Sequence, residues 1–215
     1  MPPSWHGIDE VRLTKVPLVP EVHLFLANDP VVLWARLEAA AGQRLPAPYW
    51  ASAWAGGQAL ARYVLDHAEL VAGRSVLDLA SGSGLVAIAA ALAGARTAVA
   101  NDIDPYAMAA IEANGPVNDV VLVPMSGDVL DGDGEGADVV LAGDVLYDQS
   151  MAARVVPFLH RVVDRGATVL VGDPGRGHLP DDQVRMVASY RIPAIGPSED
   201  AQIEQTNVFA VCGRS

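Results

Sequence analysis

The sequence has very little cysteine and no long hydrophobic run, and each absence excludes a class of protein. Cys212 is the single cysteine among 215 residues, so an internal disulfide is impossible and a reducing, cytoplasmic location is expected. No uninterrupted apolar run reaches the roughly 18 residues of a membrane-spanning helix, so we expect no membrane partner. The amino-terminal stretch lacks the basic-then-apolar order of a signal peptide. Five scattered histidines beside one cysteine predict no metal site.

Positive charge is scarce as well. The chain has 14 Lys and Arg residues against 26 Asp and Glu residues, for a formal net charge of −12. Nucleic-acid binders concentrate Lys and Arg against the phosphate backbone, so we expect no nucleic-acid partner. The acidic balance is compatible with a cationic substrate, such as a lysine on the surface of another protein. Many enzymes are acidic for solubility alone, so the charge leaves the substrate open, and nothing indicates the oligomeric state.

Short apolar runs alternate with helical patterns along the chain, which is typical of an α/β protein. The length of 215 residues and the hydrophobic content of 51% suit one globular domain. We expect this single domain to span 1–215, with an amino-terminal extension over 1–47 and a Rossmann-like core over 48–215. The extension is expected to lie over the cofactor or to line the substrate side.

The last part of the chain predicts the edge of the sheet. A final helix is expected over 180–190. Two apolar runs follow, at 191–195 and 207–212. Consecutive strands without a helix between them predict an antiparallel hairpin at one edge of the sheet.

The stretch from Arg74 to Asp104 organises the chain. It predicts a buried strand, a turn containing Gly82 and Gly84, a helix, and a second strand that ends before Asp102. This order is typical of a nucleotide-binding βαβ unit. The glycines allow a ligand to approach the backbone, and the acid about 20 residues further on is placed to bind ribose hydroxyls.

The position of Asp78 bears on which nucleotide binds there. Asp78 lies at the end of the first strand, where its carboxylate would repel the pyrophosphate of a dinucleotide. Such a pyrophosphate binds at the N-terminus of the following helix. S-adenosylmethionine has no phosphate and carries a cationic sulfonium and amino group, so an acid suits it. The sequence therefore favours S-adenosylmethionine over NAD, with a turn that binds no ligand as the remaining alternative.

Further candidates lie outside this unit. Trp50 and Trp54 either pack in the core or place an aromatic ring against a bound nucleoside or sulfonium. Asp128 follows a strand predicted at 120–123, and is either a turn residue or an acceptor for an adenine amino group. Asp144 and Tyr147 follow a strand predicted at 137–142 and are expected to face the same crevice as the cofactor.

The turn Asp78-Leu79-Ala80-Ser81-Gly82-Ser83-Gly84 resembles motif I of class I methyltransferases, D/E-x-G-x-G-x-G. More narrowly, the chain is similar to the lysine methyltransferases that act on the electron-transfer flavoprotein β subunit. The resemblance implies a Rossmann-like, doubly wound, mostly parallel seven-stranded sheet with an antiparallel C-terminal edge hairpin. The matching segments are 48–66, 75–90, 100–114, 139–148 and 171–176.

The resemblance also implies roles for individual residues. Asp144 and Tyr147 would be the catalytic pair that orients the methyl-accepting amine, and the substrate would contact Trp50 and Tyr147. Ten residues would bind the cofactor: Trp54, Asp78, Ser81, Gly82, Gly84, Asp102, Ile103, Asp128, Val129 and Asp144.

Two residues depart from the family pattern. Ala80 replaces the first motif glycine, which is tolerable if its backbone has a negative φ. Leu146 replaces an aromatic residue before Tyr147, which bears on the identity of the substrate more than on that of the cofactor.

The function implied is an S-adenosylmethionine-dependent N-methyltransferase that acts on a protein lysine, with the electron-transfer flavoprotein β subunit as the candidate partner. Three alternatives stay open: a small-molecule N-methyltransferase, a nicotinamide-dependent oxidoreductase and a non-catalytic cofactor-binding protein. The sequence indicates neither the exact acceptor nor the number of methyl groups transferred.

Overall fold

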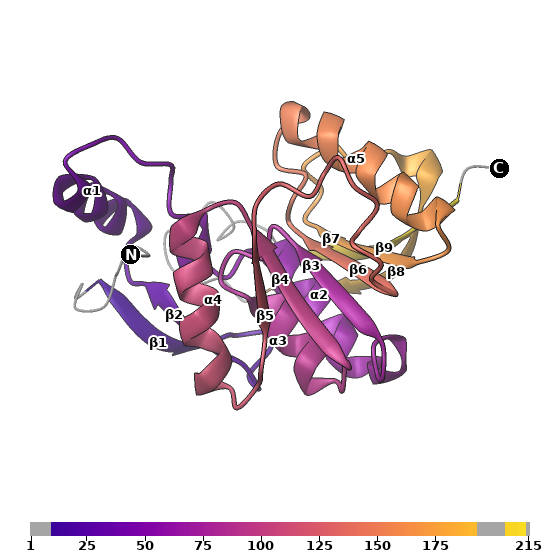
Figure 1. The fold of residues 1–215 in the computed structure, drawn as a ribbon, viewed down its shortest axis with the longest axis horizontal. Helices are drawn as coiled ribbons and strands as arrows, with labels where there is room; N and C mark the ends of the chain where they lie inside the picture. The colour runs from indigo at the N-terminus through magenta and orange to yellow at the C-terminus, as the bar shows by residue number, and fades with distance from the viewer. Residues whose placement is uncertain (1–9, 193–204, 214–215) are drawn as a thin grey trace.

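The computed structural model describes residues 10–192 and 205–213, and its centre is a seven-stranded sheet (Figure 1). The strands are β3 Ser75–Leu79, β4 Thr97–Asp102, β5 Val123–Ser126, β6 Val139–Gly143, β7 Thr168–Asp173, β8 Val184–Tyr190 and β9 Thr206–Val211, in the order β5-β4-β3-β6-β7-β9-β8. From β5 to β7 all neighbours pair in parallel, while β9 lies antiparallel between β7 and β8. The predicted mostly parallel sheet and its antiparallel C-terminal hairpin are therefore confirmed.

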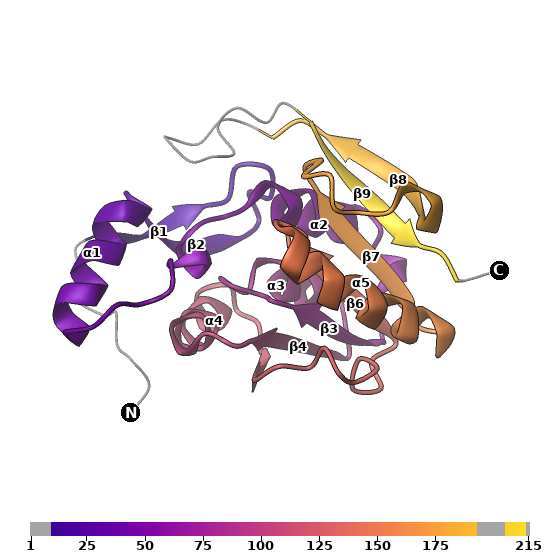
Figure 2. The same cartoon turned by 90° about the horizontal axis from the view of Figure 1, so that it is seen from above.

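Helices cover both faces of this sheet (Figure 2): α2 Ala55–Asp66, α3 Leu85–Leu92, α4 Pro105–Val117 and α5 Gln149–Asp164. Successive side chains of a strand point to opposite faces. Val76 and Leu141 therefore pack into the cluster that includes α2 and α3, whereas Leu77 and Val140 pack with α5. Ile111 of α4 lies on the same face as α3. None of the helices in the described part of the chain is both long and apolar enough to span a membrane.

The carboxyl-terminal segment differs from the prediction of a helix over 180–190. A short 3-10 turn leads directly into β8, which pairs with β9. A β-bulge between Met186 and Ala188 interrupts the alternation by which a strand is recognised in a sequence. The predicted run at 207–212 corresponds to β9, whereas most of the run at 191–195 lies outside the described residues.

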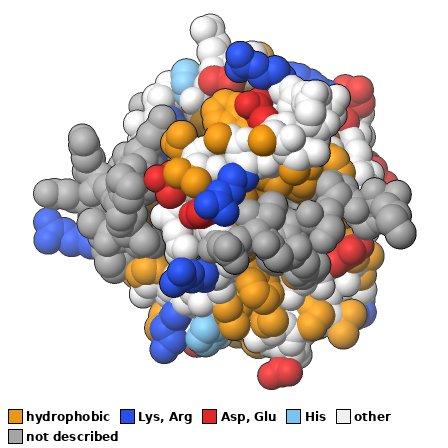
Figure 3. Space-filling view, turned by 90° about the vertical axis from the view of Figure 1, so that its left-hand side faces the viewer, with side chains coloured by type: hydrophobic (Ala, Val, Ile, Leu, Met, Phe, Trp, Pro, Cys, Tyr) orange, Lys and Arg blue, Asp and Glu red, His pale blue; other side chains and the backbone are white. Residues whose placement is uncertain are grey.

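The amino-terminal residues form a separate two-stranded antiparallel sheet, β1 Val11–Lys15 and β2 His23–Ala27, followed by α1 Pro30–Ala41. The side-chain oxygen of Asn118, the residue after α4, accepts a hydrogen bond from the backbone N–H of His23, and that of Asn114 in α4 accepts one from Phe25, both at 2.8 Å. These amides satisfy the free edge of β2 as another strand would. Figure 3 looks onto this side of the molecule, where hydrophobic patches lie between charged side chains. The predicted division between 1–47 and 48–215 stays a prediction.

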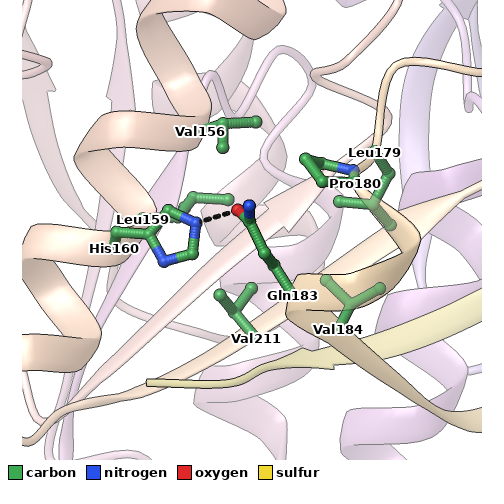
Figure 4. A pocket seen from close by; sticks show the side chains of 8 residues that line it. All are labelled: Val156, Leu159, His160, Leu179, Pro180, Gln183, Val184 and Val211. Carbon is green, nitrogen blue, oxygen red and sulfur yellow. Dashed lines mark hydrogen bonds between the residues drawn. The ribbon is translucent and has the colours of Figure 1, made fainter. Parts of the chain in front are cut away.

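A small apolar cavity lies at the opposite edge of the sheet from the carboxyl ends of its parallel strands, between α5, β8 and β9 (Figure 4). Nε2 of His160 and Oε1 of Gln183 form a hydrogen bond there, and Nδ1 of His160 has no partner among the described residues. The remaining lining is apolar and includes Val156, Leu179 and Val211. Ligands of open α/β sheets bind at the carboxyl ends of the strands, so this cavity is remote from the expected site.

Glycines let the first turn of α2 touch the ends of β6 and β7. A Cβ at Gly172 would lie 2.0 Å from the carbonyl oxygen of Gly56, and a Cβ at Gly56 would lie 2.4 Å from that of Gly172. A Cβ at Gly143 would lie 2.8 Å from Cα of Gly57. No side chain fits at these distances, so glycine is required where the helix crosses the strand ends. The crossing brings the backbone N–H of Gly56 to 2.9 Å from the carboxylate of Asp144.

Replacing Gly56 by Ala tests this close approach. The added Cβ would also lie 2.7 Å from the backbone nitrogen of Asp144, so the helix and the strand ends must separate. We expect the free energy of unfolding in urea to fall by about 3 kcal/mol. Gly57→Ala is the matched control, because its Cβ would meet Leu85 at an ordinary 3.7 Å and Ala is favoured in a helix by about 1 kcal/mol. Equal stability of the two variants would contradict the crossing.

Candidate active site

Four acidic residues come together at the carboxyl edge of the sheet. Asp78 lies in β3, Asp102 is the last residue of β4, Asp144 follows β6, and Asp173 is the last residue of β7. Because these strands are parallel, their carboxyl ends meet at one edge, where open α/β sheets bind ligands. The edge is therefore rich in carboxyl groups, which suits a ligand that carries positive charge. Among the described residues, no group of three or more His, Cys, Asp or Glu is arranged to hold a metal ion.

The turn after β3 has three residues in the left-handed region of backbone space. The φ angles are 56° for Gly82, 86° for Gly84 and 50° for Ala80. Glycine adopts this conformation freely, whereas a residue with a Cβ pays about 1–2 kcal/mol for it. The sequence alone indicated that Ala80 could replace the first motif glycine if its φ were negative. That condition is not met, and Ala80 is a strained residue in the turn.

Asp102 is held by this turn. Its Oδ2 accepts a hydrogen bond from the backbone N–H of Gly82 at 2.9 Å, and its Oδ1 accepts one from Asp104 at 2.9 Å. Each oxygen keeps a further lone pair, so the carboxylate can still accept hydrogen bonds from ribose hydroxyls. Ile103 beside it is 71% exposed and offers an apolar surface at the same edge. The geometry leaves both residues available for the cofactor contacts predicted for them.

Asp78 lies inside the turn instead of facing the crevice. It is 1% exposed, and its Oδ2 accepts hydrogen bonds from the hydroxyl of Ser81 and from the backbone N–H of Ala87, the latter at 3.0 Å. Burial raises the pKa of Asp78 to about 7, although both hydrogen bonds act in the opposite direction. The carboxyl group is thus only partly ionised near neutral pH and caps the first turn of α3. The acidic group available to a ligand at the ends of β3 and β4 is Asp102.

Asp128 lies in the loop that follows β5, which begins only at Val123, where the predicted strand ends. One carboxylate oxygen accepts a hydrogen bond from the backbone N–H of Leu130 at 3.0 Å, and the other pairs with Nη1 of Arg154 at 2.8 Å. The hydrogen bond from Arg154 lowers the pKa of Asp128 below its ordinary value. Val129 beside it is half-buried. The adenine contacts expected of this pair remain predictions.

Asp144 is engaged on both sides of its carboxylate. Oδ2 accepts the hydrogen bond from Gly56, in the first turn of α2, and Oδ1 lies 2.7 Å from Nε of Arg176. Only 3% of the Asp144 side chain is exposed. Its backbone is left-handed, with φ 59°, a conformation that Asp tolerates better than most residues. The predicted amine-orienting acid is therefore part of an ion pair that the sequence analysis did not foresee.

Three aromatic rings, which we call the aromatic rim, stand beside this ion pair: Tyr49, Trp54 and Tyr147. The ring of Tyr49 lies 5.8 Å from that of Trp54 and 5.6 Å from that of Tyr147, measured between centroids. Cζ of Arg176 lies 5.9 Å from the Trp54 centroid, within reach of a cation–π interaction. Burial raises the pKa of Tyr147, and the negative charge of Asp102 contributes to that shift. Tyr147 follows β6 and Asp102 ends β4, so both residues lie at the carboxyl edge of the sheet.

Asp173 positions Arg176. Its Oδ2 accepts hydrogen bonds from the backbone N–H groups of Gly175 at 2.8 Å and of Arg176 at 3.3 Å. Burial raises the pKa of Asp173, against the effect of these hydrogen bonds. The loop after β7 is thereby fixed, with the guanidinium of Arg176 aimed at Asp144.

The predicted residues do not all reach the crevice. Trp50 is 1% exposed and belongs to a core cluster with Leu33 and Leu37, so its burial favours core packing over the predicted substrate contact. Conversely, Tyr49 and Arg176 were assigned no role. Both lie in segments that carry the family resemblance, but a lone tyrosine and a lone arginine have no pattern that reveals their partners.

Ala80→Gly tests the strain in the turn. Glycine adopts φ 50° without a Cβ penalty, so we expect the free energy of unfolding to rise by about 1 kcal/mol, net of glycine's greater freedom in the unfolded chain. Ala93→Gly is the control, because Ala93 has φ −77° and should lose stability on the same change. Thermal and urea unfolding provide the comparison. A loss of stability in Ala80→Gly as large as that in Ala93→Gly would show that Ala80 is not strained.

A family model and the sequence relatives both match this chain to methyltransferases. The family model for ribosomal protein L11 methyltransferase (PrmA) matches residues 58–171, more than half of the chain. The electron transfer flavoprotein beta subunit lysine methyltransferase of Danio rerio is 40% identical over 182 residues, which cover 82% of this chain and 70% of the relative. The protein of the same name from Homo sapiens is 37% identical over 198 residues, which cover 89% of this chain and 75% of the relative.

A solved structure has the same fold. Ribosomal protein L11 methylase from Lactobacillus delbrueckii subsp. bulgaricus superposes with a TM-score of 0.51 at 19% identity, over 72% of this chain and 77% of that chain. At this identity the likeness supports the Rossmann-like fold alone, and the sequence relatives carry the family assignment. The chain belongs to the electron transfer flavoprotein beta subunit lysine methyltransferase family and is a methyltransferase.

Proposed function

We propose that this methyltransferase transfers a methyl group from S-adenosylmethionine to a lysine side chain of a partner protein, the electron transfer flavoprotein β subunit. The names of the relatives support the choice of partner. The observation that carries the proposal is that Asp144, paired with Arg176, and the aromatic rim beside this pair lie at the same carboxyl edge of the sheet as Asp102. An acid beside aromatic rings suits the cationic side chain of lysine.

The hydrogen-bond donors of the glycine turn fit S-adenosylmethionine better than a dinucleotide. A dinucleotide places its pyrophosphate against the first helix N-terminus of the βαβ unit. Here two donors of the turn and the helix start are already engaged, because the N–H of Ala87 donates to Asp78 and that of Gly82 donates to Asp102. A pyrophosphate would have to displace carboxyl groups from these donors. A cofactor without phosphate leaves them in place.

Residues of the same edge would hold the cofactor. Asp102 would accept hydrogen bonds from the ribose hydroxyls, Ile103 would lie against the adenine, and Asp128 with Val129 would meet the adenine edge. The turn at Ser81 and Gly82 would face the methionine end, and Trp54 would close the site from the start of α2. When bound, S-adenosylmethionine supplies a methyl carbon that an amine nitrogen attacks while the carbon–sulfur bond breaks and its electron pair passes to sulfur.

The chain's own contribution is to orient the amine and to exclude water. The nucleophile must be a neutral amine, yet only about one lysine in a few thousand is neutral at pH 7, given a reference pKa of about 10.4. Asp144 can accept a hydrogen bond from the amine and so aim its lone pair. The phenol of Tyr147 is neutral at pH 7, as tyrosine ordinarily is, so it can act as a second, neutral orienting group; burial raises its pKa further. The proton released on methylation leaves to water.

The exposure of the rim favours a protein side chain over a small molecule. Tyr49 is 53% exposed and Tyr147 is 43% exposed, so the aromatic rim opens onto the surface. A long side chain presented by a partner can reach such a site. Small-molecule sites usually enclose most of the ligand surface.

The cofactor assignment is tested by titrating the protein with S-adenosylmethionine in a calorimeter. Asp102→Ala should weaken binding by about 1–3 kcal/mol, because the ribose hydroxyls lose their acceptor. Glu69→Ala, in the short turn before β3 and away from the carboxyl edge, should bind as the unmodified chain does. NAD should not compete. If the protein bound NAD tightly, and Asp102→Ala weakened that binding, the cofactor would be a dinucleotide and the assignment of S-adenosylmethionine would be wrong.

The partner assignment is tested by incubating the enzyme with labelled S-adenosylmethionine and the electron transfer flavoprotein β subunit, followed by peptide mapping. We expect label on lysine, and none after that lysine is changed to arginine, because a permanently charged guanidinium is no amine nucleophile. Asp144→Asn should lower the transfer at least about tenfold while cofactor binding changes little. Labelling should decline as salt rises, because an acidic crevice attracts a basic surface. Robust labelling of a small amine with none on the protein would favour the small-molecule alternative.

A further inference from the structure

The guanidinium of Arg176 is the nearest cation that the structure gives to the proposed amine-orienting acid. Its Nε donates to Oδ1 of Asp144 at 2.7 Å, and its Cζ lies 5.9 Å from the ring centroid of Trp54. The Arg176 side chain is 20% exposed and that of Asp144 only 3%. The two charges are thus largely removed from water. Since Asp173 fixes the backbone of Arg176, the loop after β7 is built to deliver this cation to this place.

Methyl transfer to an amine requires a neutral nitrogen, and a cation beside Asp144 bears on that requirement. A buried carboxylate without a counter-charge stabilises whichever cation is beside it, and would hold the acceptor lysine as ammonium. Ammonium has no lone pair and cannot be methylated. A carboxylate whose charge is already balanced still accepts a hydrogen bond, but it no longer favours the protonated amine. Asp144 is balanced on two sides, by Arg176 and by the positive end of α2 at Gly56.

We propose that Arg176 is a positioning residue that neutralises Asp144, so that the acid orients the acceptor amine without keeping it protonated. This inference rests on the proposed function, since it concerns the amine that the enzyme methylates. Arginine suits the role better than lysine does. Its guanidinium stays charged at all relevant pH values and is itself no competing primary amine beside the methyl donor.

Other ionisable groups lie at the same edge of the sheet, and their titration must be separated from that of the acceptor amine. Tyr49 lies on the short turn before α2, Tyr147 and Asp148 follow β6, Asp173 ends β7, and Asp102 ends β4. His178, in the same loop as Arg176, acts electrostatically on both Asp148 and Asp173. It is the one histidine that these interactions place near the site in the described part of the chain. His178→Gln therefore separates histidine titration from that of the amine.

The experiment measures the single-turnover rate of methyl transfer to the β subunit against pH, at saturating S-adenosylmethionine. Arg176→Gln should move the acid limb of the profile upward by at least about one pH unit, because one charge a few ångströms away is worth more than that at a partly buried site. Arg176→Lys keeps the positive charge, so the acid limb of its profile should lie at the same pH as that of the unmodified enzyme. The double variant Asp144→Asn with Arg176→Gln has no unbalanced carboxylate, so its limb should return towards that of the unmodified enzyme, at a lower maximal rate. His178→Gln should leave the limb in place.

A merely structural role predicts something different. In that case Arg176→Gln lowers the rate by the same factor at every pH, and this result would overturn the inference while leaving the proposed function intact. An unmodified enzyme that methylates no lysine at any pH would overturn the proposed function, and the inference with it. Calorimetric binding of S-adenosylhomocysteine verifies that each variant is folded. If Arg176→Gln alone fails this check, the pH profiles of Arg176→Met and of the double variant are compared with that of the unmodified enzyme instead.

Discussion

The architecture of the site depends on one contact, the crossing of the first turn of α2 over the ends of β6 and β7. Gly56 and Gly172 approach so closely there that neither position has room for a Cβ. The crossing directs the N–H of Gly56 at Asp144 and sets Trp54, the residue that precedes α2, beside Arg176. A helix set further from the sheet would leave Oδ2 of Asp144 without its backbone donor and move Trp54 away from Arg176. Backbone packing, and not a particular catalytic motif, thus determines where the acid lies.

At three places along the carboxyl edge, a backbone N–H donates a hydrogen bond to an acidic side chain. Asp78 is capped by the N–H of Ala87 in α3, Asp102 by the N–H of Gly82, and Asp144 by the N–H of Gly56. Each acid is held by the backbone of a neighbouring helix start or turn, so the acidic edge does not depend on a bound cation for its stability. The same hydrogen bonds engage the amides of Gly82 and Ala87, two donors at the turn and helix start where a phosphate would bind.

Much of the fold could be predicted because the signals are local. The βαβ unit predicted at 74–104 has a strand, a glycine turn, a helix and a second strand in succession, and these correspond to β3, α3 and β4. The strand β8 was mistaken for a helix because its bulge breaks the alternation and because the pairing with β9 is a long-range interaction. Local patterns do not report such pairing.

The site was predictable by position but not by contact. The rule that ligands bind at strand ends predicted that Asp102, Asp144 and Tyr147 lie at one edge of the sheet, and they end or follow β4 and β6 there. It could not show that Asp78 turns inward, that Ala80 has a positive φ, or that Trp50 lies in the core, because those outcomes follow from three-dimensional packing. The family resemblance supplied the roles, and the structure supplied the partner of Asp144.

A crystal structure of the enzyme with S-adenosylhomocysteine and a lysine-containing peptide of the β subunit tests the central claim most directly. We expect the ribose hydroxyls on the carboxylate of Asp102, and the lysine nitrogen within hydrogen-bond distance of Asp144 while Arg176 still holds the other oxygen. A nucleoside bound away from Asp102, or a lysine that reaches the thioether sulfur without approaching Asp144, would contradict it.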